Sequence, residues 1–165
     1  MVRRAHTQRN AVAAIQAAGG QAIYDFQYDH VVFNADGKPK APRWLVDLVG
    51  VDHFAEVLAV RLRMPPKDAG AMLALVGRLT SIECLTVTDP KFGDAELLKL
   101  KTLTEVRHLN LKGTAVTDAG LKHINGMTKL KTVVLLRTLV TGNGAGRLRG
   151  TFPVAMIEWD APRAP

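Results

Sequence analysis

The feature that most constrains the fold is a pattern of apolar residues that recurs every 24 or 25 positions. Three copies, which begin at Leu79, Leu103 and Met127, carry an apolar residue at their first, fourth, seventh and ninth positions. A weaker copy begins at Phe54, 25 residues before Leu79. Self-similarity at this period is typical of solenoids in which each repeat supplies one strand and one helix. We therefore expect an α/β chain of about four stacked repeats.

The clearest copy shows the expected plan of a repeat. Residues 107–111 are expected to form a short strand, because polar and aliphatic side chains alternate from His108 to Leu111, and residues 117–124 are expected to form a helix. Because the copies have the same length, equivalent strands should align with one another. We therefore expect Leu85, Leu109 and Val133 to lie side by side on adjacent strands.

An aspartate stands at the start of each of the three most convincing repeat helices. These residues are Asp68, Asp94 and Asp118. Aspartate at a helix start accepts a hydrogen bond from a backbone N–H that has no partner within the helix. Because the three aspartates recur in register, we interpret them as helix caps and not as catalytic acids.

Two segments of different pattern flank the repeats, which we assign to residues 53–150. Residues 1–52 are expected to form an N-terminal α/β capping unit, with a helix, a strand and a short helix at 3–18, 21–28 and 44–51. Residues 151–165 are expected to form a C-terminal capping strand and tail, with the strand at 154–159. Terminal units of this kind cover the apolar ends of a repeat stack.

Aromatic residues mark both expected caps. In residues 21–28, aromatic side chains such as Tyr24 and Phe26 alternate with other residues, which predicts a strand whose aromatic side is buried. Trp44 and Trp159 are interpreted as core residues of the two caps.

The charge of the chain is unevenly distributed. Of 22 Lys and Arg residues against 15 Asp and Glu, residues 101–165 hold ten basic and four acidic ones, a net charge of +6. A basic half of this kind can bind an acidic protein, a nucleic acid or an anionic membrane surface. The same residues are also consistent with solvated helix and loop faces, because few of them lie close together in the sequence.

The sequence offers little catalytic or metal-binding chemistry. The single cysteine, Cys84, excludes an intrachain disulfide and a four-cysteine zinc site, and no histidine stands at metal-ligand spacing. Cys84 and His108 fall on neighbouring strands, but a cysteine–histidine nucleophile also needs an oxyanion hole and a cleft. The glycine-rich segment 142–146 lacks the Lys-Ser/Thr of a phosphate-binding loop. We expect no enzyme activity, no cofactor, no metal and no small-molecule substrate.

No segment of the sequence predicts insertion into a membrane. No apolar run approaches the length of a spanning helix, and a polar, basic stretch follows Met1 in place of a signal peptide. These features predict a soluble, cytoplasmic protein.

The repeat pattern resembles a known family. The segment 103–124, with its Leu-x-x-Val-x-x-Leu-x-Leu core and its Thr-Asp-x-Gly-Leu-x-x-Ile end, resembles a bacterial leucine-rich repeat of the ribonuclease-inhibitor-like kind. The resemblance extends from Phe54 to about Leu148. It implies a curved solenoid with parallel strands on a concave face, helices on a convex face, and a protein partner held on the concave face. In some similar proteins a membrane anchor precedes an Arg-rich helix, so the resemblance also implies that an anchored form exists.

The alternation of the strands places a set of side chains on the expected concave face. Ala59, Cys84 and Thr132 belong to this face, and the residues that we expect to bind a partner are Arg61, Arg63, Thr86, Thr88, His108, Asn110, Lys112, Val134 and Leu136. For Val134 and Leu136, a cover by the C-terminal segment is an equally good interpretation. The function expected is that of a non-catalytic protein–protein interaction module or scaffold. The alternative is a binder of nucleic acid or of an anionic surface that uses the basic C-terminal half.

Overall fold

The chain is α/β, with a six-stranded, mostly parallel sheet. The computed structural model describes residues 2–29, 32–33, 36–39, 41–53, 55–62 and 69–161. The strands follow the order β1-β4-β5-β6-β7-β8, and β1 alone is antiparallel to its neighbour. Their bounds are β1 Gln21–Tyr24, β4 Val57–Leu62, β5 Cys84–Val87, β6 His108–Asn110, β7 Thr132–Leu135 and β8 Met156–Trp159. A small antiparallel pair, β2 Tyr28–Asp29 and β3 Val32–Phe33, forms a second sheet.

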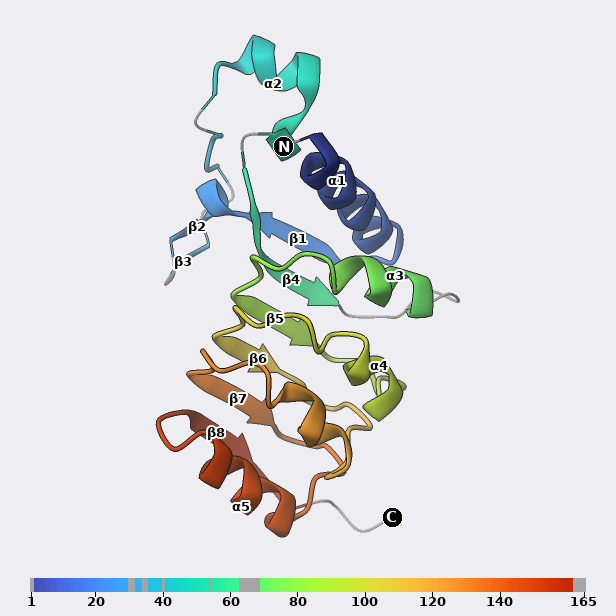
Figure 1. Ribbon diagram of the computed structural model, residues 1–165, viewed down its shortest axis with the longest axis vertical. Helices are drawn as coiled ribbons and strands as arrows, with labels where there is room; N and C mark the ends of the chain where they lie inside the picture. Colours follow the sequence, from blue (N-terminus) through green and yellow to red (C-terminus); the bar gives the residue numbers. More distant parts are fainter. Residues whose placement is uncertain are drawn as a thin grey trace.

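The described part of the chain contains five α-helices and three short 3₁₀ helices. The α-helices are α1 Val2–Ala17, α2 Arg43–Val49, α3 Ala69–Val76, α4 Asp94–Leu98 and α5 Gly142–Thr151; the 3₁₀ helices are η1 Asp25–Gln27, η2 Val51–His53 and η3 Gly120–Ile124. Helices α1, α3 and α4 follow one another along the same side of the sheet (Figure 1). Together with η3 and α5 they enclose one continuous apolar core against that side. Among these described residues, no helix has the length and the apolar content that crossing a bilayer requires.

The predicted alignment of neighbouring strands is confirmed. Leu85 is the direct partner of Leu109, and Leu109 is the direct partner of Val133. All three side chains are fully buried. The apolar pattern therefore places equivalent residues of successive repeats in contact, because each strand returns to the sheet at the same height.

For Asp94 and Asp118, the prediction that the aspartate caps its own helix is wrong. The Asp94 carboxylate accepts hydrogen bonds from the backbone N–H of Thr117, at 2.9 Å, and from its hydroxyl, at 2.6 Å. The Asp118 carboxylate accepts the same two bonds from Thr141, each at 2.7 Å. In both cases the acceptor and donor are 23 residues apart. Each of these two aspartates therefore accepts hydrogen bonds from the threonine that precedes the helix of the next repeat. Asp68, the third aspartate, lies outside the described residues.

These inter-repeat hydrogen bonds also explain two glycines. A Cβ atom on Gly120 would meet the Asp94 carboxylate, and one on Gly144 would meet the Asp118 carboxylate. Each aspartate therefore needs a threonine to bond with in the next repeat, and it also needs a glycine there, because a side chain at that position would collide with the carboxylate. The helix between residues 117 and 124 is shorter than expected, because only Gly120–Ile124 is helical and the helix is 3₁₀.

The N-terminal unit differs from the expectation in two places. The strand at 21–28 ends at Tyr24, because the Asp25 side chain accepts the Phe26 N–H, at 2.8 Å, and turns the chain into η1. Ile23, from the side expected to be exposed, is the buried residue of β1. The interpretation of Trp44 as a core residue is wrong, since this side chain is 68% exposed on α2. Trp159, in contrast, packs against the core, and its indole N–H donates to the Val140 carbonyl, at 2.8 Å.

Candidate functional site

The predicted binding residues fall mainly on one face of the sheet, the face that points away from the core. We call it the outer sheet face and define it by the row Arg61, Thr86, Asn110, Val134 and Glu158. Strand register makes each member of this row the direct partner of the next, from β4 to β8. None of the five is fully buried, and Arg61 and Glu158 are exposed. Since adjacent strands lie about 4.8 Å apart, the row spans roughly 20 Å.

A second row runs beside the first. It joins Cys84, His108, Thr132 and Met156 as direct partners. Cys84 and His108 are each partly exposed. The expectation that Ala59 also lines the exposed face is wrong, because Ala59 is only 2% exposed. Its partner on β1, Ile23, is also only 2% exposed. The row of exposed residues therefore begins at Cys84 and does not continue to β4 and β1.

Three predicted residues lie just beyond the ends of the strands. Thr88 follows β5 and is exposed, and its backbone N–H donates to the Leu62 carbonyl, at 3.2 Å. Lys112 follows β6 and is exposed, whereas Leu136 follows β7 and is half-buried. Arg63, the remaining predicted residue, lies outside the described residues.

One polar side chain on the outer sheet face already has a structural task. The side-chain oxygen of Asn110 accepts the backbone N–H of Lys112, at 3.0 Å. This bond shapes the turn after β6, and the next residue, Gly113, has a φ of 74°, which favours glycine. The position of the Asn110 side chain is therefore fixed before any partner binds.

Sequence reasoning missed the last strand's contribution to this face. The segment 154–159 was expected to cover the open end of the repeats and, as one alternative, Val134 and Leu136. Instead, β8 extends the sheet beside β7, so Met156 and Glu158 join the two rows. Val134 and Leu136 are half-buried. The signal was present in the sequence, because Met156 and Glu158 alternate with Ile157 and Trp159.

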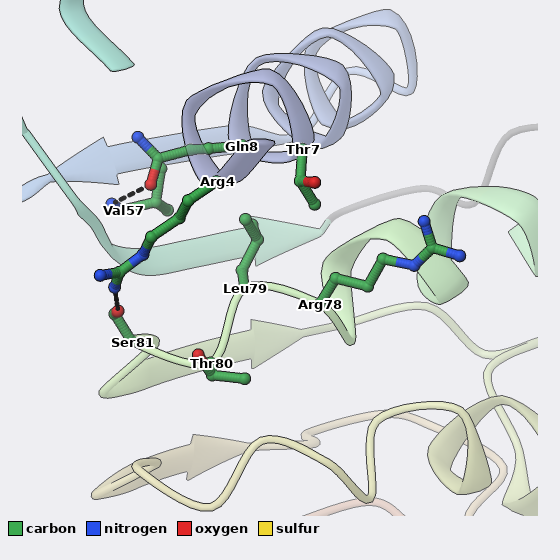
Figure 2. A pocket seen from close by; sticks show the side chains of 8 residues that line it. All are labelled: Arg4, Thr7, Gln8, Val57, Arg78, Leu79, Thr80 and Ser81. Carbon is green, nitrogen blue, oxygen red and sulfur yellow. Dashed lines mark hydrogen bonds between the residues drawn. The ribbon is translucent and has the colours of Figure 1, made fainter. Parts of the chain in front are cut away.

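A separate pocket lies between the N-terminal helix and the turn after α3. Its volume is about 380 Å³, and Figure 2 shows Thr7 of α1 and Leu79 of the turn pointing into it. The Arg4 guanidinium crosses one side and donates to the Ser81 hydroxyl, at 2.7 Å, while the Arg78 side chain points away. Arg4 also pairs with Glu56, at 2.8 Å. These contacts attach α1 to the first repeats, and they give the pocket a structural role.

The described residues contain no group of three or more His, Cys, Asp and Glu side chains arranged to hold a metal ion. Cys84 and His108 are adjacent, but the backbone N–H of His108 donates to the Glu83 carbonyl within the sheet, at 3.0 Å. That N–H therefore offers nothing to a developing oxyanion.

The charge of Asp118 gives a prediction on the pH dependence of stability. Burial acts to raise the pKa of Asp118, but the two hydrogen bonds from Thr141 and the nearby Arg147 outweigh it, so the pKa is lowered. A carboxyl whose pKa is lower in the folded state stabilises the fold above its unfolded pKa, about 3.9, and loses this contribution as the pH falls through the folded value. We therefore expect Asp118→Asn to cost stability at about pH 5 and progressively less toward pH 3 and below.

Urea unfolding of the wild type and of Asp118→Asn at several pH values between these limits measures this effect. Asp47→Asn, which changes a carboxylate that is 69% exposed and pairs with Arg43 only at 4.0 Å, is the control. A stability difference for Asp118→Asn that is the same at both ends of the pH range would contradict the assignment.

No protein-family model matches the sequence, and no curated protein matches it either.

Proposed function

We propose that the chain is a short leucine-rich repeat solenoid that binds another protein on its outer sheet face, which is then the concave face. Two observations support the solenoid. Leu85, Leu109 and Val133 recur 24 residues apart and align as direct partners. The hydrogen bonds of Asp94 and Asp118 repeat in the same order and join each repeat to the next.

The observation that carries the binding function is the chemistry of the aligned row on the outer sheet face. From β4 to β8 it presents a guanidinium, a hydroxyl, an amide, an aliphatic group and a carboxylate, at the residues Arg61, Thr86, Asn110, Val134 and Glu158. A surface of about 20 Å that mixes these groups on a fixed frame suits recognition of a protein surface. Its apolar part lies beside charged and hydrogen-bonding groups, as in many protein interfaces.

We further propose that the chain is not an enzyme. The outer sheet face is open, and Cys84 with His108 is the pair on it that most resembles a nucleophile and base. A catalytic pair of this kind works in a water-excluded site with oriented donors. Binding of a protein partner through side chains requires neither a water-excluded site nor donors aimed at one atom.

The alternative, binding of nucleic acid or an anionic surface, receives less support. The described basic residues of the C-terminal half are spread over helices, over segments before strands and over segments after strands. Lys122 and Arg149 are on η3 and α5, Lys129 precedes β7, and Lys112 and Arg137 follow strands. Phosphate binding at high affinity needs many such charges on one surface.

Affinity capture with matched charge variants tests the proposal. The immobilised baits are the wild type, Arg61→Glu/Lys112→Glu on the outer sheet face, and Lys122→Glu/Arg149→Glu on the helical side. The last two carry the same change in net charge, and all four positions are exposed. We expect proteins enriched by the wild type to remain on the helical-side variant and to be lost from the outer-face variant.

Two results would overturn the proposal. One is a partner that the outer-face variant retains and the helical-side variant loses. The other is a bait that enriches nothing above blank resin except nucleic acid, whose retention falls steeply with salt.

A further inference from the structure

The two edge strands of the sheet, β1 and β8, differ in how well their core sides are covered. At the first end, β1 is covered on its core side by α1, whose Ala11, Val12 and Ile15 are buried. At the other end, β8 is the last strand of the sheet, and among the described residues no helix follows it. The core-side residues of β8, Ile157 and Trp159, are consequently only half-buried.

Exposed apolar side chains lie on β8 and near each of its two ends. Val154 is 91% exposed, Met156 is 63% exposed and Leu139 is 55% exposed. Met156 belongs to β8, Val154 stands two residues before it, and Leu139 precedes Val140, which accepts the Trp159 hydrogen bond. Exposed apolar residues beside a free strand edge favour association through that edge.

Among the described residues, no strand pairs with β8 on the side away from β7. In a parallel pair, alternate residues direct their N–H and C=O groups toward the neighbouring strand. The Met156 N–H donates to the Lys131 carbonyl, at 2.8 Å, so the backbone N–H and C=O groups of Met156 and Glu158 point toward β7. The N–H and C=O groups of Ile157 and Trp159 therefore face away from the sheet.

We propose that a second copy of this chain pairs with β8 along this edge, antiparallel and about a two-fold axis, with Ile157 opposite Ile157 of the second copy. This register joins the outward-facing backbone groups of both strands. On the core side it places Ile157 against its counterpart and Trp159 against Ala155, which are the half-buried apolar residues. The interface is self-complementary, as a two-fold axis requires.

Electrostatics selects this register. With Ile157 on the axis, Glu158 stands opposite Met156 of the second copy. A shift that centres the pair on Glu158 would place two carboxylates directly opposite each other, which is unfavourable. The favoured register also places each exposed Met156 side chain beside Glu158 of the second copy, and it joins the outer sheet faces of the two copies into one surface.

Charge changes at Met156 test the pairing without disturbing the core, because this side chain is exposed. In the proposed dimer, Met156→Lys places two lysines opposite two Glu158 carboxylates, and Met156→Glu places like charges there. We expect Met156→Lys to lower the dimer dissociation constant about tenfold and Met156→Glu to raise it by a similar factor. Sedimentation velocity over a range of protein concentrations measures both.

Leu98→Lys on α4 is the matched control, because it introduces the same charge at another exposed apolar residue. It should leave the dissociation constant unchanged, and added salt should reduce the difference between the two Met156 variants. A wild type that stays monomeric at every concentration overturns the proposal. A loss of dimer that is equal in Met156→Lys and Met156→Glu overturns the register.

Discussion

Replacing Leu109 by alanine is expected to lower the free energy of unfolding by about 2–5 kcal/mol. Leu109 is fully buried at the centre of the sheet, between Leu85 on one side and Val133 on the other. Alanine at this position would leave a cavity between aligned strands, and the neighbouring backbones are too firmly paired to close it. Chemical denaturation of the purified variant measures the loss.

Thr86→Ala is the matched control, since Thr86 is in β5 next to Leu85 but points to the outer sheet face. It should change the free energy of unfolding by about 0.5 kcal/mol or less. Equal losses of unfolding free energy in the two variants would contradict a buried core face at Leu109 and an outer sheet face at Thr86.

Replacing Asp52 by alanine is expected to destabilise the N-terminal unit by about 2–3 kcal/mol. The Asp52 side chain is only 7% exposed and accepts hydrogen bonds from the Tyr24 hydroxyl, at 3.0 Å, and from the Gln8 amide, at 3.1 Å. It also lies 3.6 Å from the Arg9 guanidinium. Alanine would leave the Tyr24 hydroxyl and one of the two Gln8 amide N–H groups without their acceptor. Helix α1 and strand β1 would also lose the residue of η2 that they both contact.

The titration of Tyr24 belongs to the same cluster. Burial raises the pKa of its phenol, and the negative charge of Asp52 raises it further, so Tyr24 remains a hydrogen-bond donor at neutral pH. Asp47→Ala provides the comparison for Asp52→Ala, because the Asp47 side chain is 69% exposed and pairs with Arg43 only at 4.0 Å. The free energy of unfolding of Asp47→Ala should be close to that of the wild type. A cost for Asp52→Ala no greater than that for Asp47→Ala would rule out a buried polar cluster.

The apolar repeat predicted the alignment of Leu85, Leu109 and Val133 because a fixed repeat length forces equivalent residues to the same height. The alternation within the strands likewise predicted the neighbours Thr86, Asn110 and Val134. These features depend on spacing alone, and spacing is what a sequence displays most directly.

Other features depend on contacts that spacing does not reveal. Asp94 and Asp118 stand at helix starts, so local rules predicted local caps, but both carboxylates reach the next repeat. Trp44 was expected in the core of the N-terminal cap, yet its side chain is 68% exposed on α2. Ala59 is buried by its position beside β1, which joins the sheet from 36 residues earlier in the sequence. Met156 and Glu158 were missed because the last strand was interpreted as a cover and not as an extension of the sheet.

The most direct test of the stacked-repeat arrangement is a measurement of methyl–methyl nuclear Overhauser effects in the protein in solution. Leu85, Leu109 and Val133 come from three different repeats, and their side chains are adjacent only if the strands pair in the described register. We predict cross-peaks between the methyl groups of Leu85 and Leu109 and between those of Leu109 and Val133. Cross-peaks that instead join Leu109 to methyl groups of Val87 and Leu135, with none to Leu85 or Val133, would contradict this register and the repeat stack built on it.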